Sequence, residues 1–253
     1  MSLFSLENKI ALITGASRGI GESMALTFAE YGAHCILVSR KLDGLEAVVE
    51  KIRAKGGSAE AMACNMGEIE QIQQLMDAVE KKHGRLDILV NNAAANPYFG
   101  EMLQAEPWAW EKTHDVNLKG PFFMTQRAAK MMKEKGLGGA IVNVSSVNGV
   151  RPAQMQGIYS VTKAALISMT LAFAKELAPF NIRVNALLPG MTETKFSSAI
   201  TENEAISKAV ISMIPLKRIA APSEMAGAAL YLVSEASSYT TGTCLVCDGG
   251  MLA

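Results

Sequence analysis

Short apolar runs recur along the chain, separated by longer stretches that mix apolar and polar positions. We interpret the short runs as buried β-strands, and the predicted strands cover Lys9–Ile13, His34–Ser39, Ser58–Cys64, Leu86–Val90, Gly139–Val144, Ile182–Leu187 and Thr243–Val246. Most of the intervening stretches are long enough for helices. This alternation predicts an α/β fold in which helices cover both faces of a doubly wound, parallel, seven-stranded sheet.

The positions that end these strands indicate where a ligand would bind. In a doubly wound sheet the ligand crevice lies outside the carboxyl ends of the strands. The residues that mark these ends are Thr14, Ser39, Asn65, Asn91, Ser145 and Leu188. We therefore expect the chemistry of this protein along one edge of the sheet.

A glycine-rich turn follows the first predicted strand. Gly15, Gly19 and Gly21 lie between that strand and a stretch rich in Ala, Met and Phe that we interpret as a helix. Unpaired backbone N–H groups and the positive end of the helix dipole would face one point there, which favours phosphate binding. The spacing differs from the G-x-G-x-x-G fingerprint, so an ordinary glycine-rich turn remains the alternative.

Tyr159 and Lys163 are four residues apart in a stretch predicted to be helical, Gly157–Leu177. This spacing places the two side chains on one helix face. A phenol has an ordinary pKa of about 10, and a nearby ammonium favours the phenolate. We therefore expect Lys163 to lower the pKa of Tyr159 and make it a general acid or base. A solvated helix face is the alternative.

Four further segments accompany the turn and the Tyr–Lys pair. They are Asn91-Asn92-Ala93-Ala94, Asn117 in DVNLKGPF, Ser146 in IVNVSSVNG and Pro189-Gly190 in RVNALLPG. In their order along the chain, the six segments resemble the short-chain dehydrogenase/reductase family. The resemblance runs from Lys9 to Gly250 and implies a Rossmann-like fold and hydride transfer with a nicotinamide cofactor. The loop from Asn92 to Gly100 is similar to that of NADPH-dependent carbonyl reductases acting on ketones and aldehydes.

The expected catalytic residues are Asn117, Ser146, Tyr159 and Lys163. A carbonyl that accepts a hydride becomes an oxyanion, which an aimed hydroxyl beside a proton donor stabilises. We assign Tyr159 as the proton donor in reduction and Ser146 as the group that holds the carbonyl oxygen, with Ser145 as its competitor. The resemblance implies that Lys163 also hydrogen-bonds the nicotinamide ribose and that Asn117 supports a water-linked proton relay behind it. A structural role through backbone hydrogen bonds is the alternative for Asn117.

The end of the second strand indicates the cofactor. NAD-binding proteins of this type place a carboxylate there for the ribose 2′-OH, whereas this chain has Ser39, Arg40 and Lys41. Arg40, together with Arg18 in the glycine turn, could clamp a 2′-phosphate through paired donors. We therefore expect NADP(H), with NAD(H) still possible. Alternatively, Arg40 and Lys41 only solvate the start of the next helix.

The resemblance implies further cofactor contacts in the glycine turn and after later strands. These positions are Gly15, Ser17, Arg18, Gly19, Ile20, Gly21, Asn65, Met66, Asn92, Ala93, Ala94, Tyr159, Lys163, Pro189, Gly190, Thr192 and Thr194. Asn65 and Met66 would flank the adenine, where the family usually has Asp. Asn92 would approach the ribose, although a structural role is an alternative for its neighbour Asn91. Ala94 stands where the family usually has Gly, so we expect a local difference in that loop, because Ala is strained at positive φ.

The segment of about residues 190–215 resembles a substrate lid. Thr192 and Thr194 would touch the nicotinamide carboxamide and the pyrophosphate, and the apolar residues beyond them would cover the substrate. Packing of a short amphipathic helix is the alternative. Besides Ser146, the candidate substrate contacts are Asn96, Tyr98, Asn148, Met155, Met191 and Phe196. This set suggests a medium-sized, largely uncharged carbonyl.

Composition limits the possible partners and compartment. The 253 residues have a net charge of zero, 49% apolar residues and no dividing linker or repeat, so we expect one domain, 1–253, with a large core. Zero net charge argues against nucleic acid and anionic membranes as partners. No apolar run reaches about eighteen residues and no export signal is visible. A cytoplasmic location is the expectation.

Cysteine and histidine usage suggests no metal site. Cys244 and Cys247 lie in a predicted strand, where positions i and i+3 point to opposite faces. We therefore interpret them as buried structural thiols, and Cys35 and Cys64 in the same way. No histidine pair is visible in the sequence that could complete a metal site, because the only histidines are His34, His83 and His114.

Three functions remain open from the sequence. The first is an NADPH-dependent ketone or aldehyde reductase. The second is an alcohol or sugar dehydrogenase that works in the oxidative direction with NAD. The third is a redox sensor that holds NADPH without turnover, although a pure binder would need no proton donor. Apolar helix faces at 108–110 and 122–132 fit the homotetramer usual in the family.

Overall fold

All seven predicted strands are present and join one parallel sheet. The computed structural model describes residues 2–195 and 204–253. The strands are β1 Ile10–Thr14, β2 His34–Ser39, β3 Ser58–Ala63, β4 Ile88–Asn91, β5 Gly139–Val144, β6 Ile182–Pro189 and β7 Cys244–Cys247. Their order across the sheet is β3-β2-β1-β4-β5-β6-β7, with every pair parallel. The predicted boundaries differ from these by no more than two residues.

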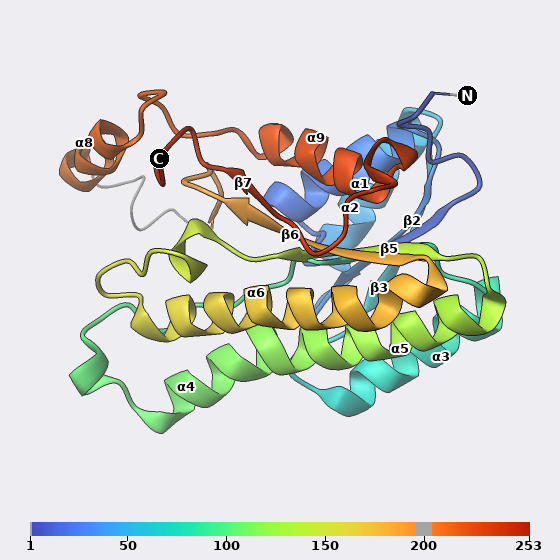
Figure 1. The fold of residues 1–253 in the computed structure, drawn as a ribbon, viewed down its shortest axis with the longest axis horizontal. Helices are drawn as coiled ribbons and strands as arrows, with labels where there is room; N and C mark the ends of the chain where they lie inside the picture. The colour runs from blue at the N-terminus through green and yellow to red at the C-terminus, as the bar shows by residue number, and fades with distance from the viewer. Residues whose placement is uncertain (1, 196–203) are drawn as a thin grey trace.

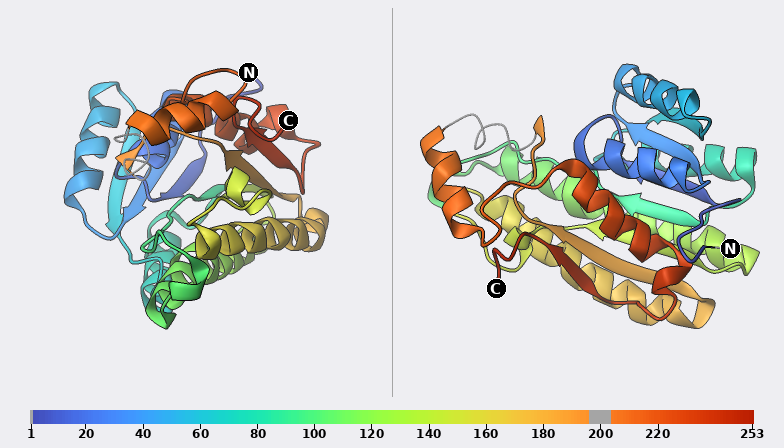
Figure 2. Two further views of the ribbon diagram at one scale, coloured as in Figure 1. Left: turned by 90° about the vertical axis from the view of Figure 1, so that its left-hand side faces the viewer. Right: turned by 90° about the horizontal axis from the view of Figure 1, so that it is seen from above.

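Helices cover both faces of the sheet, as the alternating pattern predicts (Figures 1 and 2). The longer ones are α1 Gly19–Glu30, α2 Asp43–Ala54, α3 Ile69–His83, α4 Pro107–His114, α5 Gly120–Lys135, α6 Gly157–Leu177, α8 Glu204–Met213 and α9 Pro222–Val233. The short helical turns are η1 Met102–Gln104, η3 Val147–Gly149, η4 Ala178–Phe180, η6 Glu235–Ser237 and the π-helical η2 Asp115–Lys119.

Two hydrophobic clusters fill the space on either side of the sheet. One packs α1, α2 and α9 against one face, and the other packs α3 and α5 against the opposite face. The inner strands β1, β2, β4, β5 and β6 are largely buried on both faces, which explains why they read as continuous apolar runs rather than as alternating ones. The edge strands β3 and β7 are only partly buried. Figure 1 shows α8 beyond the carboxyl ends of the strands. The region of the predicted lid therefore lies at the same edge of the sheet as the expected chemistry.

Helix α6 and the turn after it form a more apolar stretch than the sequence analysis recognised. Within the described residues, Gly157–Phe180 alone is long and apolar enough to cross a membrane, with a mean hydropathy of 1.3. Half of its most apolar window is buried inside the protein, as is common for the core helix of a folded domain. The run is not uninterrupted, because Lys163 and Lys175 divide it, so the helix passes on its average hydropathy rather than on an unbroken apolar run of about eighteen residues.

Candidate active site

The glycine turn forms a narrow cradle between β1 and α1. Gly15 has a φ of 67°, and a Cβ there would lie 2.9 Å from the Cα of Ala93. A Cβ on Gly21 would lie 2.4 Å from the carbonyl oxygen of Gly15. Helix α1 begins at Gly19, and no side chain caps it, so its first N–H groups remain available to an anion. The turn therefore has the shape and the donors that a phosphate group requires.

Thr14 holds this turn against the next strand of the site. Its buried hydroxyl donates to the carbonyl of Val90 and accepts from the backbone N–H groups of Asn92 and Ala93, at 2.9 and 3.0 Å. The side-chain amide of Asn92 donates to the carbonyls of Thr14 and Gly15. The Asn92 side-chain amide thus stabilises the glycine turn. The ribose contact expected of Asn92 would therefore have to come from other atoms of this residue. Thr14 was not assigned a role from the sequence, although its position at the end of a strand was a signal.

The loop after β4 shows no strain at Ala94. This residue lies outside the positive-φ region, so the local difference expected there does not take the form of a strained backbone. Met66, expected beside the adenine, is only 4% exposed and its side chain belongs to the hydrophobic core. The side chain of Asn65 accepts from the N–H of Gly67 at 3.2 Å and shapes the turn after β3. An adenine contact by Met66 would therefore involve its backbone.

Two adjacent serines at the end of β5 have different partners. The buried hydroxyl of Ser145 donates to the carbonyl of Lys163 at 2.8 Å. Ser146 is half-buried, accepts from the N–H of Asn148 at 3.1 Å and shares a side-chain hydrogen bond with Tyr159. Of the two hydroxyls, that of Ser146 is thus the one that lies against Tyr159, and its role at the reacting carbonyl stays a prediction.

Tyr159 and Lys163 lie together on the first turns of α6, but their electrostatics differ from the expectation. Burial raises the pKa of Tyr159 to about 12, and the hydrogen bond with Ser146 opposes this only partly. Burial also lowers the pKa of Lys163 to about 7. The Lys163 ammonium donates to the carbonyl of Val144 at 2.8 Å and lies 5.4 Å from the centre of the Tyr159 ring. The expected lowering of the Tyr159 pKa is therefore wrong for this structure, because desolvation outweighs attraction at that distance.

Asn117 is fully buried within the π-helical turn η2. Its side-chain oxygen accepts from the N–H of Ala95 at 2.7 Å, and its amide donates to the carbonyl of Ala95 and to Thr162 at 2.9 and 3.1 Å. Thr162 in turn donates to the carbonyl of Tyr159 at 2.7 Å. The side chain of Asn117 thus fixes the loop after β4 and the start of α6 relative to each other. A proton relay at this position would have to use its backbone.

Asn91 also has a structural role, as its alternative reading suggested. Its amide donates to Thr125 and to Asn143 at 2.9 and 2.8 Å, and Asn143 donates to Thr170. This buried chain of hydrogen bonds links β4 and β5 to helices α5 and α6. Among the described residues, the side-chain oxygen of Asn91 is the one buried side-chain polar atom that lacks a hydrogen-bond partner.

The expected substrate contacts gather around a residue that the sequence analysis missed. The amides of Asn96 and Asn148 both point to the side-chain oxygen of Gln156, at 3.2 and 3.5 Å. Gln156 immediately precedes α6, and a polar residue three positions before Tyr159 was the signal. The backbone of Met155 accepts from the N–H of Gly100 at 2.9 Å and so pins the same loop. The result is a polar cluster of Asn96, Asn148 and Gln156 next to the start of α6.

The remaining substrate candidates are less directly placed. The hydroxyl of Tyr98 donates to the carbonyl of Glu101 at 2.6 Å, so it serves a local turn. Met191 is half-buried, and Phe196 lies outside the described residues. Thr194 lies over the glycine turn, since its methyl carbon is 3.2 Å from where a Cβ of Gly19 would stand. Thr192 is buried and donates to the carbonyl of Gly190.

The two arginines expected to recognise a 2′-phosphate are both exposed. Neither Arg18 nor Arg40 forms an ion pair with any described residue. The hydroxyl of Ser39 donates a hydrogen bond to the carbonyl of Lys41 at 2.8 Å. The described carboxylates therefore do not compete with a phosphate for these guanidinium groups.

The four cysteines are free thiols. Cys35 and Cys64 are buried, and burial raises their pKa values to about 12 and about 11. Cys244 and Cys247 are only half-buried, so the expectation that they would be buried was wrong, although burial still raises both pKa values. Strand β7 lies at the edge of the sheet, which explains their partial exposure.

Sequence comparison with known proteins shows similarity to oxidoreductases over nearly the whole chain. Residues 15–252 match a family model described as enoyl-(acyl carrier protein) reductase. The chain is 38% identical to dehydrogenase/reductase SDR family member 4 of Oryctolagus cuniculus over 245 residues, which cover 97% of this chain and 94% of that protein.

Two solved structures show the same similarity in three dimensions. A short-chain type dehydrogenase/reductase from Mycobacterium marinum has a TM-score of 0.93 and 38% identity, covering 98% of this chain and 97% of the other. A gluconate 5-dehydrogenase from Burkholderia cenocepacia J2315, in complex with NADP and tartrate, has a TM-score of 0.94 and 32% identity, with coverage of 98% and 97%.

Proposed function

Because the chain belongs to the short-chain dehydrogenase/reductase family, whose members are oxidoreductases, we propose that it reduces a ketone or aldehyde with NADPH. The observation that carries this proposal is the grouping of Ser146, Tyr159 and Lys163 at the carboxyl end of β5, at the same edge of the parallel sheet as the glycine turn after β1. When bound, NADPH would supply a hydride to the carbonyl carbon. The electron pair of the C=O bond moves to the oxygen, which takes the proton of the Tyr159 hydroxyl.

The pKa values support the reductive direction. Reduction consumes a proton, and a tyrosine whose pKa is raised to about 12 by burial carries that proton throughout the neutral range. Oxidation of an alcohol needs the phenolate as a base, which burial disfavours. Lys163, with its pKa lowered to about 7 by burial, can return a proton toward Tyr159 at working pH. Ser146 orients the carbonyl oxygen and stabilises its developing charge.

The fit of the site to NADPH is supported by shape and by charge. The glycines of the turn leave room for a pyrophosphate at the N-terminus of α1, where a Cβ would collide with backbone. Arg18 and Arg40 offer guanidinium groups to a 2′-phosphate, and NADP is the cofactor in the Burkholderia structure. These residues favour NADP(H) over NAD(H).

A second candidate function is oxidation of a sugar acid. The similarity to gluconate 5-dehydrogenase favours it, and so does the cluster of Asn96, Asn148 and Gln156, whose amides could hydrogen-bond several hydroxyls. This function uses the same catalytic residues in the opposite direction. The two candidates differ in substrate polarity and in the pH at which turnover is fastest.

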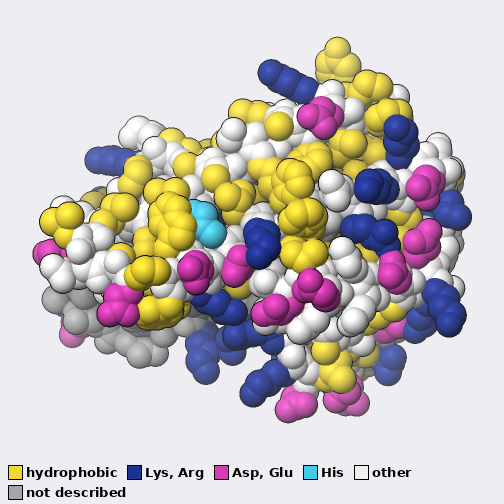
Figure 3. Space-filling view, turned by 90° about the horizontal axis from the view of Figure 1, so that it is seen from below, with side chains coloured by type: hydrophobic (Ala, Val, Ile, Leu, Met, Phe, Trp, Pro, Cys, Tyr) yellow, Lys and Arg dark blue, Asp and Glu magenta, His cyan; other side chains and the backbone are white. Residues whose placement is uncertain are grey.

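We also propose that the protein is a homotetramer. Trp108 and Trp110 on α4 and Phe122 on α5 are 52%, 46% and 40% exposed, whereas Met124 and Met132 of α5 are buried. Figure 3 shows hydrophobic side chains gathered on the face of the protein that carries these helices. Exposed aromatic side chains of this kind favour association. Light scattering coupled to gel filtration tests the assembly, and a monomer at micromolar concentration would exclude it.

The test of the activity is the loss of NADPH absorbance at 340 nm with a panel of diketones, quinones, aromatic aldehydes and β-ketoesters. The reverse assay uses NADP⁺ with gluconate and secondary alcohols. We expect turnover of an uncharged carbonyl with NADPH that the Tyr159→Phe variant abolishes. Tyr231→Phe is the matched control, because that hydroxyl shares a hydrogen bond with Thr240 and with none of the candidate catalytic residues.

Each outcome of this test separates the candidates. Faster turnover of gluconate than of any carbonyl would favour the sugar-acid dehydrogenase. Tight NADPH binding without turnover in either direction would replace both enzymes by an NADPH-binding sensor. Equal activity of wild type and Tyr159→Phe would show that Tyr159 is not the proton donor.

A further inference from the structure

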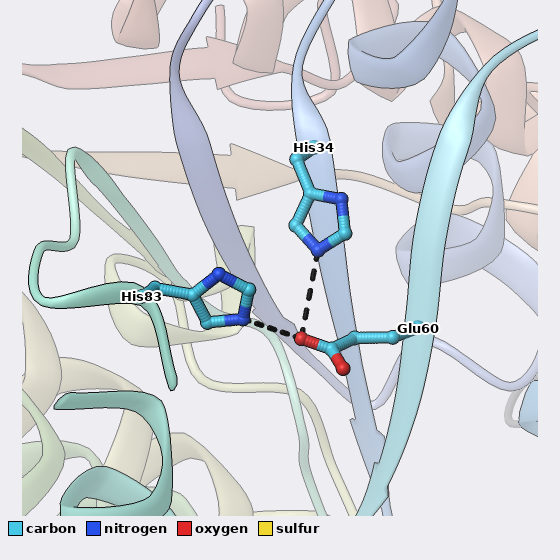
Figure 4. A group of neighbouring side chains, drawn as sticks. All are labelled: His34, Glu60 and His83. Atoms are coloured by element: carbon cyan, nitrogen blue, oxygen red, sulfur yellow. Dashed lines mark hydrogen bonds and ion pairs between the residues drawn. The ribbon is translucent and has the colours of Figure 1, made fainter. Parts of the chain in front are cut away.

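A second group of polar side chains lies toward the amino ends of the strands, away from the candidate active site. It contains His34, the first residue of β2; Glu60, in edge strand β3; and His83, the last residue of α3 (Figure 4). No histidine pair was expected from the sequence, yet the two imidazole rings are 5.2 Å apart. Strand pairing and the packing of α3 bring together residues that are distant along the chain.

The donor atoms of these three residues converge on one point. Nε2 of His34 and Nε2 of His83 lie 3.5 and 2.5 Å from the same carboxylate oxygen of Glu60. All three ligand atoms lie within 4.8 Å of one another. Bonds of about 2.0–2.1 Å in a tetrahedral zinc site place neighbouring ligand atoms ~3.3 Å apart. Small side-chain rotations would therefore place an ion between the three atoms.

The surroundings support the required protonation states. Nδ1 of His34 lies 2.7 Å from the hydroxyl of Ser58, which can accept a hydrogen bond from an Nδ1–H group, and in that tautomer the Nε2 lone pair is left for a metal. Such an outer partner is usual for metal-binding histidines. The Glu60 carboxylate has a cation beside it as well, since its second oxygen lies against the Lys82 ammonium.

Lys82 is the competing cation at this cluster. Its ammonium contacts the other carboxylate oxygen of Glu60, and 61% of the side chain is exposed. The oxygen that both histidines approach is thus separate from the one that Lys82 contacts. Because Lys82 is largely exposed, it can move aside at little cost while His34 and His83 stay in place.

We propose that His34, Glu60 and His83 bind a divalent transition-metal ion of the zinc class. Two imidazoles and one carboxylate form a nitrogen-rich ligand set that suits zinc better than magnesium or calcium. Water would complete the coordination. The ion would link edge strand β3 to β2 and to the end of α3, so its effect is on stability and on protection of this sheet edge rather than on hydride transfer.

The experiment is calorimetric titration of the purified full chain with ZnCl₂, compared with a His34→Gln, His83→Gln double variant. Every protein in this experiment, including the reference protein called wild type, carries Cys244→Ser and Cys247→Ser, so that the half-buried thiols cannot bind the ion. His114→Gln is the matched control, because this third histidine lies on α4 and contacts Trp110. We expect one zinc per chain in wild type and in His114→Gln, and binding at least tenfold weaker in the double variant.

Thermal unfolding with and without zinc gives an independent measurement. Zinc should raise the Tm of wild type and of His114→Gln but not that of the double variant. The single variant His83→Gln, together with circular dichroism of each protein, shows whether the folds are retained. Absence of zinc binding to wild type, or equal affinity in a folded double or His83→Gln variant, would overturn the proposal. Stronger binding of Mg²⁺ than of Zn²⁺ would also contradict it.

Discussion

Tyr159 and Lys163, at the carboxyl ends of the strands, are 8% and 2% exposed, whereas the side chains of Glu60 and His83, at the opposite end, are 15% and 13% exposed. At the first end, burial raises the pKa of Tyr159 and lowers that of Lys163, so it disfavours charge on both groups. At the second end, burial is countered by partners, and the pKa of Glu60 stays below its ordinary value. Burial therefore sets the direction of the pKa shifts at the candidate active site, where a proton must be transferred. Hydrogen bonds and ion pairs set the direction of the Glu60 pKa shift at the other end, where they hold strands and a helix together.

After the complete loss of turnover expected for Tyr159→Phe, the largest effect concerns Ser146, next to the proton donor. Ser146→Ala should lower kcat by about 10²–10³-fold, because it removes a hydroxyl aimed at the developing oxyanion. Ser145→Ala should instead leave kcat within about tenfold and destabilise the fold by ~1 kcal/mol, since it removes a hydrogen bond to the Lys163 carbonyl. Steady-state kinetics and urea unfolding measure both variants. Equal losses of kcat would contradict the assignment.

A change in the phosphate cradle should damage both binding and stability. Gly21→Ala places a methyl group where the Gly15 carbonyl lies, 2.4 Å away, and the backbone must move. We expect a loss of about 1–3 kcal/mol in the free energy of unfolding and weaker NADPH binding. Gly227→Ala is the control, because a Cβ there would meet no atom within 4 Å and the site lies in the exposed part of α9. An unchanged dissociation constant in Gly21→Ala would indicate that the phosphates bind elsewhere.

Burial of Lys163 should destabilise the protein in a pH-dependent way. Its folded pKa of about 7 lies below the ordinary value of 10.5, so the unfolded chain binds more protons between these two pH values. The cost is full below pH 7, falls as pH rises, and disappears above pH 10.5. Lys163→Met should therefore gain stability relative to wild type most at pH 6 and less at pH 9, while losing activity.

Urea unfolding of both proteins at pH 6, 7.5 and 9 measures this difference. The loss of the hydrogen bond to Val144 lowers the stability of the variant by a similar amount at each pH. The change with pH is therefore the diagnostic quantity. A stability difference independent of pH would show that Lys163 titrates in the folded protein as it does in the unfolded chain.

Arg40 is expected to have a moderate effect on cofactor choice. Arg40→Ala should raise the dissociation constant of NADPH about tenfold, equivalent to ~1.4 kcal/mol, and leave that of NADH nearly unchanged. Lys55→Ala, at the exposed end of α2, is the control for loss of a positive charge. Fluorescence titration with both cofactors measures the ratio, and parallel loss of NADH affinity would exclude a specific contact with the 2′-phosphate.

The smallest effect on catalysis is expected at the opposite end of the sheet. His83→Gln should leave kcat and KM unchanged and alter the free energy of unfolding by about 1 kcal/mol without metal, because one hydrogen bond is lost while Lys82 keeps its contact with Glu60. Kinetics and urea unfolding in the presence of a chelator check this. A marked loss of kcat would show that the two ends of the sheet are coupled.

The outcome for individual residues shows how far sequence reasoning reaches. Thr14 ends one buried strand and Ser146 lies just after another, and the carboxyl ends of parallel strands must meet at one edge, so their common location was predictable. The side-chain amides of Asn92 and Asn117 are committed to the backbone of Gly15 and Ala95, and no local pattern reveals such partners. His34 and His83 meet only because β3 and α3 pack beside β2.

By itself, the sequence determined the sheet, the glycine turn, the Tyr–Lys pair and the serine that faces it, because each depends on strand and helix periodicity or on residues close along the chain. The tertiary structure alone decided that the Tyr159 pKa rises, that Gln156 gathers two asparagines and that two histidines share Glu60. Desolvation and hydrogen bonding depend on what surrounds a group in space, and those neighbours come from segments that only folding brings together.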